Sequence, residues 1–279
     1  MNTSLQQEME KQVQKALQED IGDGDISAAL IDAGQRAAAT IVCREQAVLC
    51  GTAWVDCCFR QFDHTVELQW LIHEGQMVTP DTDLCRLRGS ARSLLTVERT
   101  ALNFLQTLSA TASAANEYVK RLEHCPIRLL DTRKTLPGWR LAQKYATTVG
   151  GADNHRMGLF DAYLIKENHI AACGGIINAV SQARKLQPDR PVQVEVENLA
   201  ELAQALEARA DSILLDNFTL ADMRRAVAAN NSRARLEASG GVTLDTIAAI
   251  AETGVDAVSV GAITKHIQAV DLSMRFTTE

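Results

Sequence analysis

Short apolar runs alternate with amphipathic helical segments after residue 126, and this rhythm constrains the fold more than any other feature of the sequence. The candidate strands are residues 127–130, 162–165, 192–196, 212–215, 236–238 and 257–260. Strands separated in this way by helices form right-handed β-α units around a parallel sheet. Six such strands predict an incomplete barrel or an open doubly wound sheet. In both, the carboxyl ends of the strands meet at one edge, where ligands bind.

The first 125 residues follow a different pattern. We expect an opening helix over 3–19, a helix over 52–61 and a long helix over 91–122, in which the small residues 109–115 permit a break. The intervening β-rich segments are 37–43, 47–50, 66–73 and 84–87. We therefore expect an N-terminal α/β domain over residues 1–110, with a connecting helix to about 125. A catalytic domain over 111–279 follows, with a C-terminal segment able to pack back on the first domain.

The acids of the loop at 20–27 could be calcium ligands. Its acids at 20, 23 and 25 lack the full spacing and the terminal glutamate of an EF-hand, so a capped turn is favoured.

Composition favours a cytoplasmic globular protein. The 279 residues are 46% hydrophobic and 23% charged, and no apolar run approaches the ~18 residues of a membrane span. No secretory leader is recognisable at the start. The seven cysteines form no C-x-x-C pair and no zinc pattern, so we expect buried free thiols.

Positive charge is concentrated between residues 133 and 166. Six Lys or Arg residues stand there against Asp153 and Asp161, a local charge of +4 in a chain of −7, so the remainder carries −11. This contrast indicates a small, multiply charged anion as the ligand and excludes nucleic acid or an anionic membrane as the expected partner.

The individual cations have different expected roles. Arg133 and Lys134 directly follow the strand 127–130, and Lys166 follows the strand 162–165, so all three are expected at the ligand edge. For Arg140 and Lys144, four residues apart on a helix, a place on the protein surface is an equally good interpretation.

Two glycine loops follow the last two strands. Ser239, Gly240 and Gly241 lie between a strand and a helix, and Val260, Gly261 and Ala262 repeat the arrangement one unit later. Backbone N–H groups at such loops converge on a phosphate. Paired loops of this kind predict a phosphoryl site, as in many β/α barrels.

Two carboxylates end consecutive strands. Glu195 and Asp216 suit Mg²⁺, which takes few protein oxygens and completes its shell with water and phosphate. A structural salt bridge of either acid with Lys166 or Arg156 is the alternative. Glu197 faces the same side of its strand as Glu195 and could take its place.

The sequence offers no convincing nucleophile. Transfer of a sugar phosphate from a pyrophosphate donor needs none, because the protein orients the reactants and neutralises the leaving group. His155, beside the cations, could donate to a carboxylate, shuttle a proton or be structural. His169 is expected at a helix start.

The motifs together resemble a known family. They are ERTALN at 98–103, DTRKTLPG at 131–138, NHR at 154–156, LIKENH at 164–169, VEVEN at 194–198, LDN at 215–217 and ASGG at 238–241. In order and in content they resemble the quinolinate phosphoribosyltransferase family over nearly the whole chain.

The resemblance implies an enzyme of NAD biosynthesis. Such an enzyme joins quinolinate to 5-phosphoribosyl 1-diphosphate and yields nicotinate mononucleotide, pyrophosphate and CO2. The implied fold is an open α/β sandwich followed by a partial α/β barrel. The implied assembly is a homodimer in which Arg99 reaches the site of the partner subunit.

Residue roles follow by the same resemblance. Those implied for the quinolinate carboxylates are Arg99, Arg133, His155 and Arg156, with Thr132 beside them. Those implied for the donor are Lys134, Lys166, Ser239, Gly240, Gly241, Val260, Gly261 and Ala262. Glu195, in preference to Glu197, and Asp216 match the acidic pair for ribose and Mg²⁺. The segment Thr264-Lys265-His266 differs in sequence from some members of the family. This difference puts only minor contacts in question.

Three alternatives remain at this stage. One is a phosphoribosyltransferase acting on nicotinate, although the surplus of arginines favours a dicarboxylate. Another is a barrel lyase with a Schiff base on Lys166. The third is a donor-sensing protein without activity, in which the acceptor-binding arginines would have no task.

Overall fold

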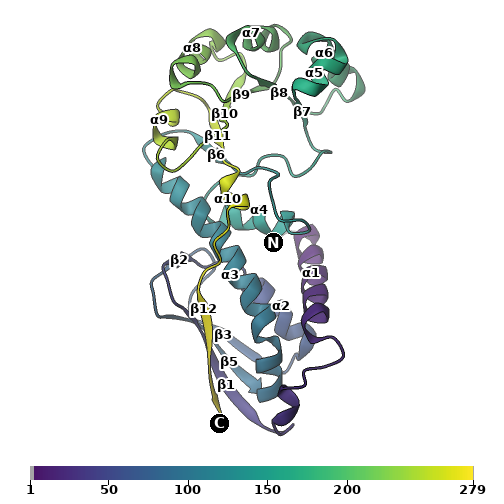
Figure 1. The fold of residues 1–279 in the computed structure, drawn as a ribbon, viewed down its shortest axis with the longest axis vertical. Coiled ribbons are helices and arrows are strands. Elements are labelled where there is room, and N and C mark those ends of the chain that lie inside the picture. Colours follow the sequence, from purple (N-terminus) through teal and green to yellow (C-terminus); the bar gives the residue numbers. More distant parts are fainter. Residues whose placement is uncertain (1–2, 279) are drawn as a thin grey trace. The chain divides into compact units, whose positions relative to one another are not determined.

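The computed structural model describes residues 3–278, and the chain divides into two compact units (Figure 1). The first unit comprises the chain up to Asn116 together with Leu141–Gly151 and the segment from His266 onward. The second comprises Glu117–Arg140 and Ala152–Lys265. The units thus interleave along the chain, whereas we expected one boundary at residue 111 and a C-terminal segment able to pack back on the first domain.

The first unit packs helices against a small antiparallel sheet. Its sheet has the order β12-β1-β5-β3, formed by β12 (Leu272–Thr278), β1 (Arg36–Cys43), β5 (Thr82–Ser90) and β3 (Glu67–Trp70). A two-stranded sheet pairs β2 (Ala47–Val48) with β4 (Met77–Val78). The helical elements are α1 (Thr3–Ile21), the short 3-10 helix η1 (Ala28–Leu30), α2 (Thr52–Phe62), most of α3 (Ala91–Arg121) and most of α4 (Arg140–Val149). The helices expected over 3–19, 52–61 and 91–122 are confirmed.

Periodic apolar residues explain the packing of α1. Leu5, Met9, Val13 and Leu17 recur every four residues and are the buried positions of the helix. Such spacing lines one face of a helix, and this face packs against α2.

The long helix α3 is continuous, so the break considered at 109–115 is wrong. The small polar side chains there form hydrogen bonds that need no break in the helix. Ser109 Oγ accepts from the N–H of Cys50 at 3.0 Å and donates to its carbonyl at 3.1 Å. Ser113 Oγ accepts from the N–H of Val48 at 2.8 Å. The small residues therefore let the β2 segment approach the helix closely.

The structure also decides the expectations for the acidic loop at 20–27, for Lys144 and for the cysteines. Asp25 Oδ1 accepts from the N–H groups of Ser27 and Ala28, both at 2.9 Å, so the capped turn is confirmed. Lys144 is fully buried in α4, so of the two interpretations left open for it, a place on the surface is wrong. Of the seven cysteines, all are free and five are buried, while Cys125 and Cys173 are partly exposed.

The second unit is a parallel sheet with the order β6-β11-β10-β9-β8-β7. The strands are β6 (Arg128–Leu130), β7 (Tyr163–Ile165), β8 (Val192–Val196), β9 (Ser212–Asp216), β10 (Arg235–Ser239) and β11 (Ala257–Ser259). All six strands expected from the sequence are confirmed. Among the strands of residues 3–278, β6 pairs with β11 and β7 pairs with β8, so the sheet stays open between β6 and β7. Leu130 of β6 also forms an isolated parallel bridge with Asp153.

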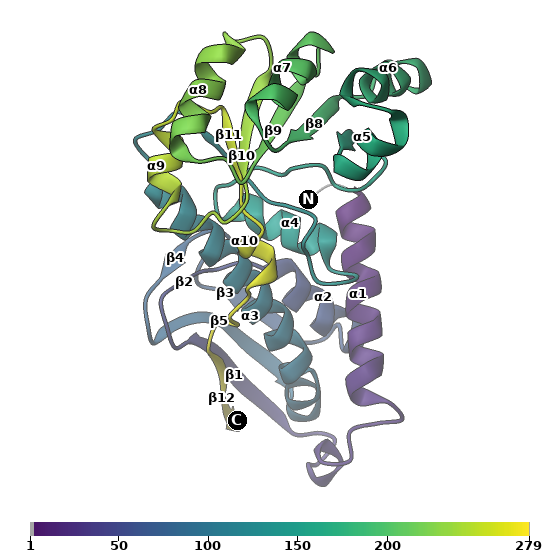
Figure 2. The same cartoon turned by 45° about the horizontal axis from the view of Figure 1, so that its top comes forward.

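Helices line the outer side of this sheet (Figure 2). They are α6 (Ile176–Leu186), α7 (Leu199–Glu207), α8 (Leu220–Asn230) and α9 (Ile247–Ala251), whose buried apolar residues cover one side of the strands. The alternate strand residues are therefore left for the inner side. Two further short helices, α5 (Glu167–Cys173) and α10 (Ala262–Lys265), follow β7 and β11. Within residues 3–278, no helix is long and apolar enough to span a membrane.

Candidate active site

A pocket of about 310 Å³ lies inside the second unit at the carboxyl ends of its strands. Its lining is mostly charged or polar: Thr132, Arg133, Lys134, His155, Arg156, Leu164, Lys166, Glu195, Leu214, Asp216, Glu237, Ser239 and Ser259. Nine of the residues predicted for the site are therefore brought together in one cavity.

Strand alternation explains how the inner residues reach this pocket. On β8, Val192, Val194 and Val196 are fully buried, whereas Glu195 faces the cavity. Register then places Asp216 of β9 beside Ser239 of β10. Residues two apart on a strand share a face. A strand can therefore contribute one side chain at its carboxyl end and a second side chain one layer deeper in the pocket.

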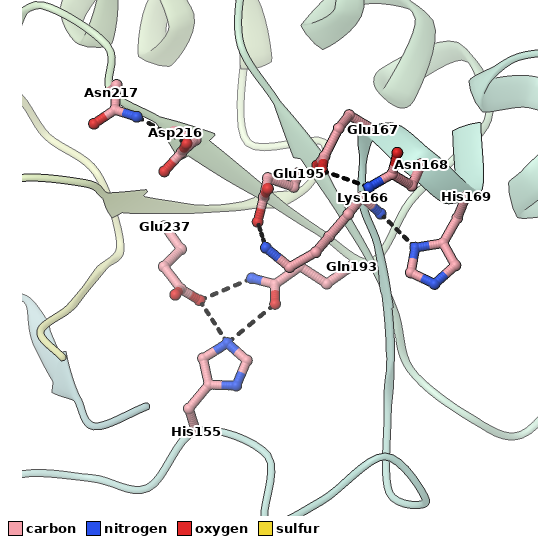
Figure 3. A network of polar contacts seen from close by, with 10 residues as sticks. All are labelled: His155, Lys166, Glu167, Asn168, His169, Gln193, Glu195, Asp216, Asn217 and Glu237. Carbon is pink, nitrogen blue, oxygen red and sulfur yellow. Dashed lines mark hydrogen bonds and ion pairs between the residues drawn. The ribbon is translucent and has the colours of Figure 1, made fainter. Parts of the chain in front are cut away.

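Of the two glutamates weighed for the acidic pair, Glu195 lines the pocket and Glu197 does not. Lys166 Nζ forms a close ion pair with Glu195 Oε2, whose side chain is only 12% exposed (Figure 3). Glu197 lies at the start of α7, where its N–H donates to Glu201. The salt bridge weighed as an alternative role for Glu195 thus exists in the ligand-free chain, with Lys166 as the partner.

Asp216 is held differently from Glu195. Its Oδ2 accepts from the side-chain amide of its neighbour Asn217 at 2.9 Å (Figure 3). Asn217 in turn requires a glycine opposite it. A Cβ at Gly240, whose φ is +90°, would lie 2.2 Å from Asn217 Oδ1. Gly240 is therefore needed for close approach between the ends of β9 and β10.

The second glycine loop closes on Lys134. A Cβ at Gly261 would lie 2.8 Å from Lys134 Cδ and 3.4 Å from Thr132 Oγ1. Thr264 Oγ1 also donates to the carbonyl of Lys134 at 2.8 Å. Glycine at 261 thus lets the loop after β11 pack against the lysine that follows β6.

Arg133 and Arg156 are two neighbouring positive charges in the pocket. Burial lowers the pKa of Arg156, and the nearby charge of Arg133 lowers it further, against the opposing effect of Asp161. Arg133 Nε is buried and has no hydrogen-bond partner among residues 3–278. Two neighbouring guanidinium groups of like charge are suited to an anion that neutralises both.

Asp131 holds the loop that carries His155 and Arg156. The fully buried Asp131 accepts from Asn154 Nδ2 and from the N–H of His155, both at 2.8 Å. Asp161 accepts from the N–H of Met157 at 2.6 Å. The backbone of the loop is thus fixed on both sides of Arg156.

Both ring nitrogens of His155 are engaged by the protein. Its Nδ1 accepts from the N–H of Arg156 at 2.7 Å. Its Nε2 lies 3.1 Å from Gln193 Oε1 and 3.4 Å from Glu237 Oε2 (Figure 3). The ring therefore connects the loop before β7 to the inner layer of the sheet.

Sequence reasoning missed Glu237 and Gln193. Both are buried, and Gln193 Nε2 donates to Glu237 Oε2 at 2.8 Å. Burial acts to raise the pKa of the Glu237 carboxyl, but the hydrogen bond and the charge of His155, together with hydrogen bonds from Ser259 and Gln193, outweigh it, and the pKa is lowered. The missed signal was an acid within the apolar run 236–238, two residues before Ser239.

Other predicted residues lie outside the pocket lining. Arg99 is exposed on α3 in the first unit. Gly240, Gly241, Val260, Gly261 and Ala262 belong to the two loops but do not line the cavity. His169 is at the start of α5 as expected, where its Nδ1 accepts from the N–H of Lys166 at 3.1 Å.

The parallel sheet with covering helices and a cationic pocket at its strand ends defines a barrel-type α/β enzyme acting on anionic substrates. The chain belongs to the quinolinate phosphoribosyltransferase family. The model of the N-terminal domain of this family matches residues 25–109, and that of the C-terminal domain matches residues 111–275.

Individual relatives agree with this family. A nicotinate-nucleotide pyrophosphorylase structure from Francisella tularensis is 48% identical, with a TM-score of 0.95 over 97% of this chain and 96% of that one. A Synechocystis protein named "Probable nicotinate-nucleotide pyrophosphorylase (carboxylating)" is 41% identical over 94% of this chain and 90% of its own length. A Nicotiana tabacum quinolinate phosphoribosyltransferase, named as decarboxylating, is 36% identical over 96% of this chain and 82% of its own length.

Proposed function

We propose that this chain transfers a phosphoribosyl group from 5-phosphoribosyl 1-diphosphate to quinolinate, with loss of one carboxylate as CO2. The products are nicotinate mononucleotide and pyrophosphate, so the enzyme serves NAD biosynthesis. The observation that carries the proposal is the pair Arg133 and Arg156, two like charges in a pocket that also holds two lysines. A planar dicarboxylate supplies the negative charge that this pair lacks.

The acceptor carboxylates are assigned to Arg133 and Arg156, with Thr132 beside them. The buried Nε of Arg133 supports this assignment, because a carboxylate oxygen would satisfy it. His155 lies in the same wall but already bonds to the protein through both ring nitrogens. We therefore assign it to shaping the acceptor site, with any contact to quinolinate secondary to that of the arginines.

The donor is assigned to the opposite part of the pocket. Lys134 and Lys166 would neutralise the pyrophosphate and contact the ribose. The loops 239–241 and 260–262 would receive the 5-phosphate on their backbone N–H groups. The close approaches at Gly240 and Gly261 support this assignment, because they bring both loops near the strand ends.

A magnesium ion fits the donor site as a ligand shared with the substrate. No cluster of three or more acidic, His or Cys side chains suited to a metal occurs within residues 3–278. Mg²⁺ often binds through one or two carboxylates together with substrate phosphates. Asp216 is the better candidate, because Glu195 is paired with Lys166. When bound, the ion would neutralise charge on the leaving pyrophosphate.

The chemistry requires orientation more than covalent catalysis. As pyrophosphate leaves, the anomeric carbon becomes cationic, and the ring nitrogen of quinolinate attacks it. The ribosylated ring nitrogen is then positive, so loss of the adjacent carboxylate leaves a carbanion stabilised as an ylid. Phosphoribosyl transfer is therefore expected to precede CO2 release. Release of labelled CO2 from quinolinate without donor would contradict this order.

We further propose a cytoplasmic homodimer in which Arg99 enters the site of the partner subunit. The exposed position of Arg99 on α3 is compatible with this role, because its side chain is available to a second chain.

The deciding experiment is an assay of quinolinate consumption with the donor and Mg²⁺ both present, and with each withheld. We expect nicotinate mononucleotide only in the complete mixture. Nicotinate is the competing acceptor, since it offers one carboxylate to the same arginines. Faster turnover of nicotinate than of quinolinate would refute the proposed substrate. Trapping of a substrate on Lys166 by borohydride would favour a Schiff-base lyase instead.

A further inference from the structure

The buried carboxylate of Glu237 has no role in the reaction described above. It lies in the inner layer of the pocket, its side chain is 6% exposed, and its lowered pKa keeps it ionised. An ionised acid in the floor of a site for a dicarboxylate opposes substrate binding by charge alone. Its presence therefore calls for a task that an acceptor oxygen performs at this position.

Hydrogen-bond directions follow from Glu237. An ionised carboxylate only accepts hydrogen bonds, so the atom of Gln193 that meets it at 2.8 Å is the amide nitrogen. The other end of the same amide, Oε1, then lies 3.1 Å from His155 Nε2. Glu237 Oε2 is itself 3.4 Å from this nitrogen (Figure 3).

The tautomer of His155 follows in turn. Two acceptors, Gln193 Oε1 and Glu237 Oε2, face Nε2, so this nitrogen carries the proton. The lone pair of the neutral ring is then on Nδ1, which accepts from the N–H of Arg156 at 2.7 Å. A proton on Nδ1 would turn this contact into a repulsion between two donors.

We infer that Glu237 is a positioning residue that acts through Gln193 and His155 to fix the backbone of Arg156. The chain of contacts runs from the inner layer of the sheet to the arginine assigned to the acceptor. A carboxylate that holds one ring nitrogen fixes the tautomer and the orientation of an imidazole in other enzyme sites as well. The effect on catalysis rests on the proposed function, whereas the tautomer does not.

The direct test is ¹⁵N NMR of histidine-labelled, ligand-free protein at mildly alkaline pH. The His155 signals are identified by their absence from His155→Asn. We expect a single neutral tautomer, protonated at Nε2. A wild-type ring protonated at Nδ1, or at both nitrogens, would overturn the inference whatever the variants do.

Two variants separate hydrogen-bond direction from charge. Glu237→Met removes the acceptor at similar volume, so we expect mixed tautomers and a KM for quinolinate raised about tenfold. The KM for the donor should change less than about threefold, because the two lysines are untouched. Glu237→Gln keeps one oxygen that can replace Oε2 and should restore most of both properties. Glu252→Met, an exposed glutamate after α9, is the matched control.

Each remaining outcome is decisive. A Glu237→Gln variant no better than Glu237→Met would show that charge matters and not direction, and would overturn the inference. So would a Glu237→Met variant with the wild-type tautomer and KM. If the variants do not fold, the wild-type tautomer decides. An Nε2-protonated His155 in a protein that does not turn over quinolinate would leave the positioning role intact and refute the proposed function.

Discussion

At the scale of single residues, the pocket depends on arginine side chains whose charge and hydrogen-bonding capacity are only partly satisfied by their neighbours. Burial and the nearby charge of Arg133 lower the pKa of Arg156, and the Nε of Arg133 is buried without a partner among residues 3–278. Both features are costly in the ligand-free chain and are relieved by a bound carboxylate. The same unsatisfied groups that cost free energy in the site therefore favour the binding of an anionic acceptor.

Arg133→Ala should weaken quinolinate binding more than donor binding. Loss of a charge-assisted hydrogen bond costs about 1.5–3 kcal/mol, which corresponds to roughly a tenfold to hundredfold increase in the dissociation constant. Calorimetric titration with quinolinate measures this directly. Arg225→Ala, at an arginine 70% exposed on α8, is the control. Unchanged quinolinate affinity in Arg133→Ala would remove Arg133 from the acceptor site.

Gly240→Ala should impair the loop after β10. The new Cβ would lie 2.2 Å from Asn217 Oδ1, and the φ of +90° disfavours any side chain. We expect a loss of about 1–3 kcal/mol in the free energy of unfolding, together with weaker donor binding. Gly22→Ala has a positive φ but open space around it, so it should cost only about 1 kcal/mol. Equal losses in urea unfolding would argue against the clash.

At the scale of elements, local patterns and distant partners contribute different information. The strands of the second unit were predicted because each is a short apolar run bounded by turn residues. The break that the small residues of α3 permit does not occur, because small polar residues favour turns only when nothing else satisfies them. Ser109 finds its partner in Cys50, 59 residues earlier in the chain. No local rule could include that contact.

Ser109→Ala should therefore destabilise the first unit without breaking α3. The substitution leaves a buried N–H and a buried carbonyl of Cys50 without their side-chain partner. We expect the free energy of unfolding to fall by about 1–3 kcal/mol while helical circular dichroism is preserved. Ser181→Ala, at an exposed position of α6, should be nearly neutral. A neutral Ser109→Ala would show that these bonds contribute no net stability.

At the scale of the whole molecule, chain order and spatial order differ. β12, at residues 272–278, pairs with β1 at residues 36–43 in antiparallel register, from Cys43 opposite Leu272 to Ala37 opposite Thr278. One sheet thus joins strands from the beginning and the end of the described chain. Completion of the first unit therefore requires nearly the full length of the protein.

Removal of β12 by truncation after Asp271 should destabilise the first unit. β1 would become an edge strand with unpaired backbone groups, which promotes association between chains. We expect a lower midpoint in urea unfolding and more aggregation on size-exclusion chromatography. Truncation of Glu279 alone is the control and should leave both unchanged. A truncated protein as stable as the full chain would show that β12 is dispensable.

Complementation tests whether sites are shared between subunits. Arg99→Ala and Lys166→Ala should each be inactive alone, while a refolded mixture should recover part of the wild-type activity. In a mixed dimer one site can draw an intact Arg99 and an intact Lys166 from different chains. The double variant Arg99→Ala, Lys166→Ala mixed with wild type is the control for subunit exchange. No recovery in mixtures that exchange subunits would place both residues in a site of one chain.

The sequence by itself determined the elements of the second unit and the residues at their ends. Strand periodicity and glycine position are local properties, so they already place Arg133, Lys166, Glu195 and Asp216 at one edge of a sheet. Only the tertiary structure decided that Lys144 is buried, that β12 completes the first sheet and that Glu237 reaches His155 through Gln193. Each of these depends on contacts between residues far apart in the chain. Such contacts are set by packing and hydrogen-bond satisfaction in three dimensions, which no local pattern records.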